Sequence, residues 1–284
     1  MSSFMRVIAL RQASLTYPTG RKTFSVMQAF PAGLTAEEAD PFLMLDFFGP
    51  TKSAGVRAHA DDYQVGWHPH RGMDIVTYIR EGIGRHADSL GNREVFTSPG
   101  VQWCSVGSGI EHAEAGGTPA GHNTTGFQIW LNVPSLKKMD APRYGTHGAE
   151  ELQEREVAVG VRARVLSGTA WGVQGPIASV QPLQMVDYSI GAHAILEHEV
   201  PAHLDNAMVF VYAGQGVVEE GGAAIRPLAQ YDIVRFDASD ASARRLRFRA
   251  GEGGAFLLLM SGKRLLQVSL SGILRSNSAG AAPA

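Results

Sequence analysis

The chain has 284 residues, of which 44% are hydrophobic and 18% are charged, and its formal net charge is -2. This composition is typical of a globular protein that is long enough for two domains. The small net charge argues against binding to nucleic acid or to an anionic membrane surface.

Cysteine content and apolar runs indicate the cellular compartment. The single cysteine, Cys104, excludes an internal disulfide framework and is typical of a reducing compartment. The first residues lack the basic start and apolar block of a secretory signal, and no apolar run reaches the ~18–20 residues that a membrane span needs. We therefore expect a cytoplasmic protein without a membrane span, or a nuclear one if the source is a eukaryote.

Short strands separated by turn residues recur along the chain. Helical periodicity is limited to residues 36–45 and 149–155, where each stretch has room for a turn or two. Segments of alternating or apolar residues that end at glycine or proline predict strands over Asp74–Ile79, Phe127–Val133, Ala207–Tyr212 and Ala255–Met260. The sequence therefore predicts an all-β fold of sandwich or barrel type.

An internal echo indicates two related halves. Gly82-Ile83-Gly84 and Gly214-Gln215-Gly216 each end a predicted strand in the same style. Aligning these glycines places Val200 and Ala202 opposite His68 and His70, so the second half lacks the histidines of the first. We expect an N-terminal barrel with a metal site over 1–134, a linker over 135–156, a C-terminal barrel without metal over 157–270, and a disordered tail over 271–284.

Two short motifs in the first half carry ligand-type side chains. Residues two apart on a strand project from the same face, so His68 and His70 share one face, as do His112 and Glu114. If the two strands face each other, three imidazoles and one carboxylate converge on one divalent transition metal. Four protein ligands leave two adjacent positions of an octahedral ion for a bidentate substrate, or for substrate and O2. A structural zinc site is disfavoured, because such sites usually contain several cysteines.

Other residues have expected supporting or minor roles. Asp74 follows Gly72 on the face of His70, so we expect it to accept a hydrogen bond from the outer ring nitrogen of a ligand histidine. His193, His198 and His203 lack the two-residue spacing of a ligand pair, and we expect them to be surface histidines.

The longer motifs around these ligands resemble the pirin family of the cupin superfamily. The resemblance rests on Gly66-Trp67-His68-Pro69-His70-Arg71-Gly72, Pro99-Gly100-Val101-Gln102-Trp103, Gly109-Ile110-Glu111-His112-Ala113-Glu114 and Gln128-Ile129-Trp130-Leu131-Asn132. It implies a bicupin, in which two antiparallel β-barrels with few short helices pack face to face. It also implies that His68, His70, His112 and Glu114 bind iron or a similar metal, with Ni, Cu, Co, Mn and Zn as alternatives. Where the family usually has glutamate after this histidine motif, the chain has the shorter Asp74.

The resemblance links the chain to quercetin 2,3-dioxygenase activity, in which O2 opens a flavonol ring and carbon monoxide is released. Our first hypothesis is a metal-dependent dioxygenase of this type acting on a small aromatic substrate such as a flavonol, with Glu114 as the group that accepts the proton of the substrate's enol. The second is a metal-sensing or redox-sensing binding protein that co-regulates a transcription or metabolic protein partner. A third is another cupin reaction, such as an isomerisation through an enediolate.

Overall fold

A computed structural model describes residues 4–18, 25–52, 63–117, 122–220 and 224–267. Almost all regular structure in these residues is antiparallel β-sheet, and the first half of the chain supplies most of two sheets. A seven-stranded sheet has the order β12-β9-β6-β11-β4-β3-β2, and its strands are β2 (Ser14–Thr16), β3 (Val26–Phe30), β4 (Phe42–Lys52), β6 (Met73–Glu81), β9 (Gly100–Ser105), β11 (Asn123–Asn132) and β12 (Arg143–His147). A four-stranded sheet has the order β5-β10-β7-β8, with β5 (Val65–His70), β7 (Ile83–Asp88), β8 (Arg93–Thr97) and β10 (Ile110–Gly117).

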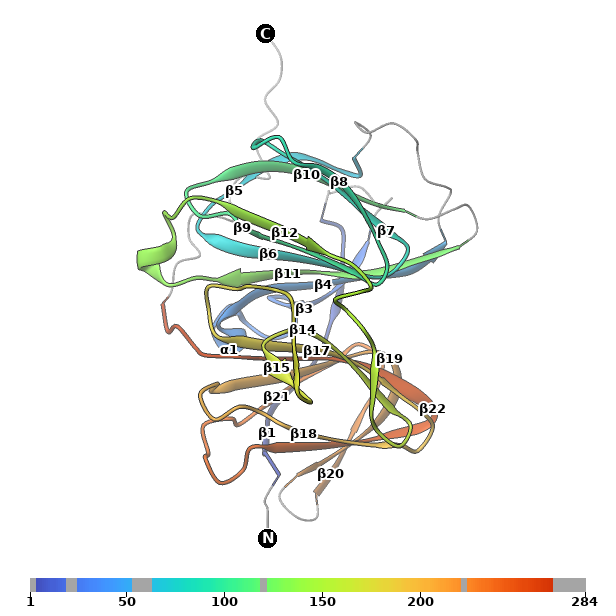
Figure 1. Ribbon diagram of the computed structural model, residues 1–284. Helices are drawn as coiled ribbons and strands as arrows, with labels where there is room; N and C mark the ends of the chain where they lie inside the picture. Colours follow the sequence, from blue (N-terminus) through green and yellow to red (C-terminus); the bar gives the residue numbers. More distant parts are fainter. Residues whose placement is uncertain (1–3, 19–24, 53–62, 118–121, 221–223, 268–284) are drawn as a thin grey trace.

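The second half of the chain forms most of a nine-stranded sheet. Its strands are β1 (Val7–Gln12), β13 (Arg155–Ala158), β14 (Val161–Ser167), β17 (Leu183–Ile190), β18 (Ile195–Glu199), β19 (Asn206–Glu220), β20 (Ala224–Leu228), β21 (Asp232–Phe236) and β22 (Arg245–Gly262). A small hairpin consists of β15 (Thr169–Ala170) and β16 (Val173–Gln174). The expected strands are confirmed, and the fold is an all-β bicupin with two sheet units stacked face to face (Figure 1).

Helical structure is as scarce as the sequence predicts. Helix α1 (Ala36–Ala39) begins at a capping box in which Thr35 and Glu38 exchange side-chain and backbone hydrogen bonds. The stretch 149–155 contains one turn, closed by the backbone N–H of Leu152 on the carbonyl of Gly148, and a 3-10 turn, η1, covers Ser135–Lys137. No helix among the described ranges is long and apolar enough to cross a bilayer.

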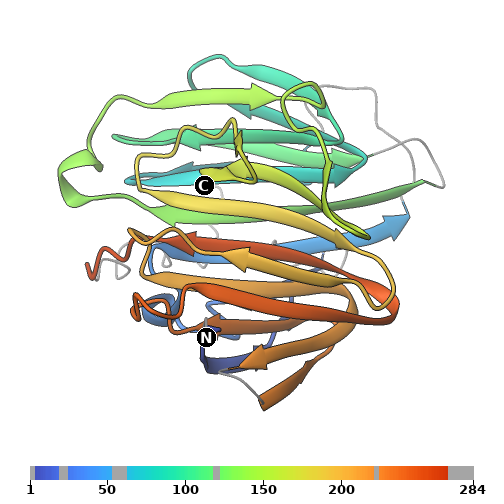
Figure 2. The same ribbon diagram turned by 60° about the horizontal axis from the view of Figure 1, so that its bottom comes forward.

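The two units share one apolar core. Phe47 and Phe127 of the seven-stranded sheet meet Phe210 and Tyr212 of the nine-stranded sheet, with ring centroids 5.1 to 6.5 Å apart across the interface. All four residues are almost fully buried. Figure 2 shows the sheets of the two units lying flat against each other along this layer. Aromatic side chains of this size bury enough apolar surface to hold two such sheets together.

A buried carboxylate joins the two units within this core. Asp187 on β17 is 1% exposed, and the hydroxyl of Tyr78 on β6 donates to its Oδ2 at 2.7 Å. The guanidinium groups of Arg80 and Arg164 lie 3.2 and 3.4 Å from the same oxygen, and the hydroxyl of Tyr212 donates to Oδ1. A buried charge is tolerated only when paired and hydrogen-bonded, as this one is.

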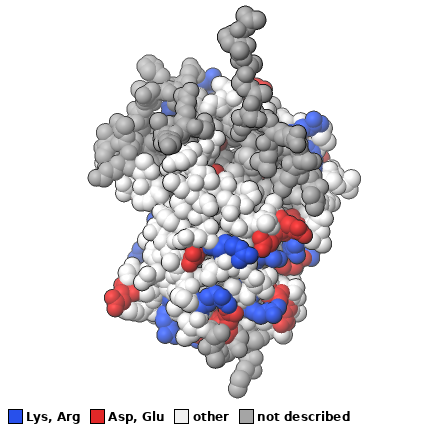
Figure 3. Space-filling model, turned by 180° about the vertical axis from the view of Figure 1, so that it is seen from behind, with Lys and Arg blue, Asp and Glu red and all other residues white. Residues whose placement is uncertain are grey.

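Two strands lie outside the sequence ranges expected for their units. β1 pairs with β21 in the nine-stranded sheet, and β12, which lies within the expected linker, pairs with β9 in the seven-stranded sheet. The division at residues 134 and 157 stays a prediction, and the tail 271–284 lies outside the described residues. Positive and negative side chains are interspersed on the face in Figure 3.

The two glycines of the internal echo, Gly84 and Gly216, are each covered by a phenylalanine ring, although the two rings come from non-equivalent strands, β8 and β22. A Cβ on Gly84 would lie 2.3 Å from the ring of Phe96, and a Cβ on Gly216 would lie 2.3 Å from the ring of Phe248. The register of the strands nevertheless corrects the expected alignment, since it places His198, and not Val200, at the position of His68. The connection between β18 and β19 is longer than the one between β5 and β6, so an ungapped alignment slips there.

Counting along the same register gives the counterparts of the other ligand-type residues. Leu246 stands at the position of His112, Phe248 at that of Glu114, and Val200 at that of His70. All three are 1% exposed. At these three positions the second unit therefore carries apolar core side chains, and it has a histidine, His198, only at the position of His68.

Candidate metal centre

The four-stranded sheet brings the two histidine motifs together. His68 on β5 pairs directly with His112 on β10, and His70 pairs with Ile110 two positions along. The Nε2 atoms of His68 and His112 are 3.0 Å apart, and the three rings of His68, His70 and His112 lie 4.5 to 4.7 Å apart. Each ring offers one nitrogen such that the three nitrogens lie within 4.8 Å of one another. The three imidazoles that strand spacing placed on facing strands therefore do lie together.

Glu114 lies next to this trio and is held from the opposite sheet. A β-bulge follows His112 on β10, and Oε2 of Glu114 lies 3.8 Å from Nε2 of His112. The hydroxyl of Thr77 on β6 donates to Oε1 at 2.9 Å, and the amide of Gln128 on β11 donates to Oε2 at 3.2 Å. Thr77 and Gln128 are neighbours across the seven-stranded sheet. The carboxylate thus has two fixed donors and still faces the imidazoles.

Burial keeps the imidazoles neutral. His70 and His112 are 6% and 1% exposed, and burial, reinforced by the neighbouring imidazoles, lowers the pKa of His70 to about 3 and that of His112 to about 2. A neutral imidazole has a free lone pair, which is the form that binds a metal. Nδ1 of His68 lies 2.7 Å from the carbonyl oxygen of Gly66, so Nε2 is the ring nitrogen of His68 that faces the other imidazoles and can bind a metal.

The donor set fits a divalent transition metal. Both ring nitrogens of His70 are buried without a hydrogen-bond partner, and leaving both unpaired is costly unless one of them binds something else. Two ligands at a right angle on an ion with bonds of about 2.1 Å lie about 3 Å apart, close to the separation of the His68 and His112 nitrogens. Three imidazoles and a carboxylate could therefore hold one such ion.

His86 is a candidate ligand that the sequence reasoning missed. It lies on β7 directly opposite Glu114, and it forms a second possible group with His112 and Glu114, whose donor atoms lie within 4.8 Å of one another. Its Nε2 is 3.3 Å from Oδ2 of Asp88, and its Nδ1 is buried without a partner. The sequence did contain a signal for His86, because His86 and Asp88 are two residues apart on a strand, the same spacing as in His68-Pro69-His70 and His112-Ala113-Glu114.

The supporting role expected of Asp74 is not found. Asp74 is 2% exposed, and its Oδ2 accepts the backbone N–H of Val180 at 3.3 Å, while the ring nitrogens of His70 bond to nothing. Asp74 does not share the face of His70, because the chain turns at Gly72, where φ is +71°. β5 therefore ends at His70, and Asp74 belongs to β6 in the other sheet. Burial raises the pKa of Asp74.

Apolar and aromatic side chains surround the centre. The ring of Trp130 lies 5.1 Å from that of His70, and its Nε1 is buried without a partner. Met73, Ile75 and Ile110 belong to the same buried cluster. Cys104 also belongs to it, and burial raises the pKa of its thiol to about 12, so this cysteine is an apolar core residue and not a reactive thiolate.

Comparison with known proteins decides the family. The pirin family model matches residues 23–131. A protein of Pseudomonas aeruginosa with the name "Putative quercetin 2,3-dioxygenase" is 32% identical over 240 residues, which cover 82% of this chain and 79% of that protein. The chain belongs to the pirin family. Against three further pirin-like relatives, the matched region spans 54% to 64% of the relative's own length.

Solved pirin-type structures share the fold. The crystal structure of a quercetin 2,3-dioxygenase from Acinetobacter baumannii matches with a TM-score of 0.81 at 23% identity, covering 93% of this chain and 89% of that one. A bacterial pirin from Escherichia coli in complex with nickel(II) matches with a TM-score of 0.61 at 18% identity, covering 90% of this chain and 99% of that one. At these identities the likeness shows the bicupin architecture.

Proposed function

We propose that this pirin-family chain is a metal-dependent dioxygenase of the quercetinase type, which cleaves a flavonol or a similar enol-bearing aromatic with O2. The observation that carries the proposal is the cluster of His68, His70 and His112, with the carboxylate of Glu114 3.8 Å from His112. Both ring nitrogens of His70 are buried there without a protein partner. Such a set leaves open positions on an octahedral ion, and open positions distinguish catalytic from structural metal sites.

The chain's own residues supply proton transfer and positioning. A bound divalent cation provides Lewis acidity that favours the deprotonated form of a substrate enol. Glu114 accepts the enol proton on its carboxylate, and the donors Thr77 and Gln128 keep that carboxylate oriented. The aromatic wall of Trp130 beside His70 suits a flat substrate.

The proposal includes the identity of the metal and the setting of the reaction. We put iron first, with Ni, Cu, Co, Mn and Zn as alternatives, because imidazole and carboxylate ligands suit this whole group. The nickel-bound pirin of Escherichia coli supports a divalent transition metal at this type of site. We expect the reaction in the cytoplasm, because the free, buried thiol of Cys104 is typical of a reducing compartment.

An oxygen-electrode assay tests the proposal. Metal-free protein is reloaded separately with Fe(II), Ni, Co, Cu, Mn or Zn, and quercetin is added while O2 uptake and flavonol absorbance are followed. At least one metal should give turnover, and Glu114→Gln should lower it by about a hundredfold or more. Glu111→Gln is the matched control, because Glu111 lies on the same strand but is exposed.

Two outcomes would overturn the dioxygenase proposal. One is O2 uptake that, with every metal tested, is no faster than the uptake by His112→Ala. The other is turnover that Glu114→Gln and Glu111→Gln leave equally unchanged. Metal binding without any turnover would favour the alternative of a metal-sensing or redox-sensing binding protein.

A further inference from the structure

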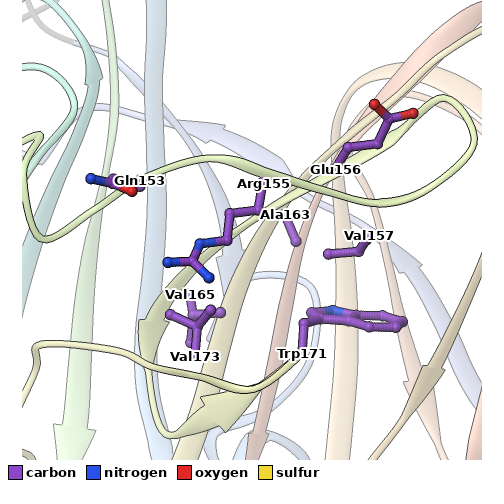
Figure 4. Close-up of a pocket in the computed structure, with 8 residues that line it drawn as sticks. All are labelled: Gln153, Arg155, Glu156, Val157, Ala163, Val165, Trp171 and Val173. Carbon is purple, nitrogen blue, oxygen red and sulfur yellow. The ribbon is translucent and has the colours of Figure 1, made fainter.

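The second unit contains a cavity that the metal centre does not explain. Its volume is about 420 Å³, which lies within the usual range for small-molecule sites. Figure 4 shows it between β13, β14 and the β15–β16 hairpin. Its apolar lining comes from Val157, Ala163, Val165, Val173 and the indole of Trp171, and Arg155 contributes a cation.

Arg155 lies in a row of side chains that leads into the unit. Across the sheet, Arg155 pairs with Ala163, and Ala163 pairs with Tyr188. Directly paired residues project from the same face, so Arg155 stands on the face that carries the buried side chains of Ala163 and Tyr188. The methyl group of Ala163 is the smallest of the row, which leaves space between the guanidinium and the tyrosine.

Among the residues that the structure describes, no carboxylate is paired with Arg155. Glu154 bonds to Ser189 and lies near Arg162 and Arg164. Glu156, which also lines the cavity, accepts the backbone N–H of Gly160. The guanidinium of Arg155 is therefore available to an anion.

Trp171 is held in place over the cavity at the cost of an uncommon backbone conformation. It is 42% exposed and occupies a two-residue turn with φ of +54°, followed by Gly172 at +72°. Such turns prefer Asn-Gly, and a bulky residue at positive φ is unusual. The indole N–H donates to the hydroxyl of Tyr188 at 2.9 Å.

A buried chain of hydrogen bonds fixes that tyrosine in turn. Its hydroxyl lies 2.6 Å from Nδ1 of His198, whose Nε2 lies 2.8 Å from Oε1 of Gln184. The expectation that His198 is a surface histidine is wrong, since it is 2% exposed. The edge of the indole is anchored by this chain, and its face remains available for stacking in the cavity (Figure 4).

We propose that this cavity is a second small-molecule site, which binds a planar aromatic carboxylate. The carboxylate pairs with the guanidinium of Arg155, a geometry that arginine favours. The ring stacks on Trp171, and the valine side chains enclose its edges. The site is independent of the metal and of the dioxygenase activity proposed for the first unit.

Calorimetric titration of the metal-loaded, full-length protein with 2-naphthoate tests the proposal. We expect one site per chain, and we expect 2-naphthamide, which lacks the charge, to bind about tenfold more weakly. Arg155→Gln and Trp171→Asn should each weaken 2-naphthoate binding by about tenfold or more. Trp171→Asn creates the preferred Asn-Gly turn, so the hairpin should keep its fold.

Controls separate this site from the metal centre. Arg162→Gln removes an exposed arginine from the adjacent strand and should change the affinity by less than about twofold. His112→Leu, at the metal centre, should also change the affinity for 2-naphthoate by less than about twofold. The proposal is overturned if 2-naphthoate does not bind at roughly 5 mM, or if Arg155→Gln and Trp171→Asn bind it like the original chain. Loss of binding in His112→Leu instead would place the carboxylate at the metal centre and would also overturn it.

Discussion

Replacing His112 by leucine should separate the metal-dependent part of the stability from the rest. His112 is 1% exposed, and its Nδ1 has no partner. In the second unit Leu246 occupies the equivalent position and is equally buried. Leucine is therefore the substitution that this fold already accommodates at that point of the sheet.

The size of the effect follows from mass action. Free metal at a hundred times its dissociation constant stabilises the folded form by about 2.7 kcal/mol. At roughly 2–4 °C for each kcal/mol in a chain of this size, the melting temperature should rise by about 5–10 °C. Without metal, His112→Leu should be unchanged or about 1 kcal/mol more stable, because it removes a buried imidazole whose Nδ1 lacks a partner.

Thermal melts followed by circular dichroism, with and without Ni²⁺, provide the assay. The original chain should show the full metal-dependent rise, and His112→Leu should show a rise of less than about 1 °C. His198→Gln is the matched control, since it changes a buried histidine of the other unit and should keep the rise. An equal rise in His112→Leu would refute the reasoning, as would a metal-free His112→Leu that melts more than about 10 °C lower.

Three further predictions concern other groups. Asp187→Leu should destabilise the protein by about 3–5 kcal/mol in urea unfolding, because it leaves buried guanidinium groups unpaired; a loss below about 1 kcal/mol would show that the network is not needed. Thr77→Val should lower kcat about tenfold at unchanged metal content, since Glu114 loses a fixed hydrogen-bond donor. The control Thr97→Val, at an exposed threonine, should leave kcat unchanged. Burial lowers the pKa of His198 to about 4, so the unfolded chain takes up this proton first as pH falls below about 6.5. The free energy of unfolding that neutral His198 contributes is therefore fully present above about pH 6.5. It falls by about 1 kcal/mol for each pH unit between about pH 6.5 and pH 4. Urea unfolding at pH 7, 6 and 5 should therefore show a shallower pH dependence in His198→Gln; equal slopes would contradict this.

Strand periodicity was enough to predict that His68, His70 and His112 lie together, but not what surrounds them. The two-residue spacing in His68-Pro69-His70 and His112-Ala113-Glu114 fixed which side chains share a face, and the direct pairing of His68 with His112 completed the site. Thr77 lies across from Glu114 in a different sheet, and such a contact depends on the stacking of sheets, which local sequence does not encode.

The failures of the sequence reasoning have local physical causes. Asp74 was assigned to the wrong face because Gly72 turns the chain between two sheets. His86 was overlooked because its importance depends on β7 pairing with β10, which places it opposite Glu114. The exchange of β1 into the second unit depends on a partner more than two hundred residues away in the sequence, at Asp232–Phe236.

Anomalous diffraction from crystals loaded with Fe(II) or Ni²⁺ would test the central claim most directly. The account predicts one strong peak per chain, about 2.0–2.2 Å from a nitrogen of each of His68, His70 and His112 and from an oxygen of Glu114. A peak bound by His86 together with His112 and Glu114, but distant from His68 and His70, would contradict it. So would full metal loading with no peak between β5 and β10.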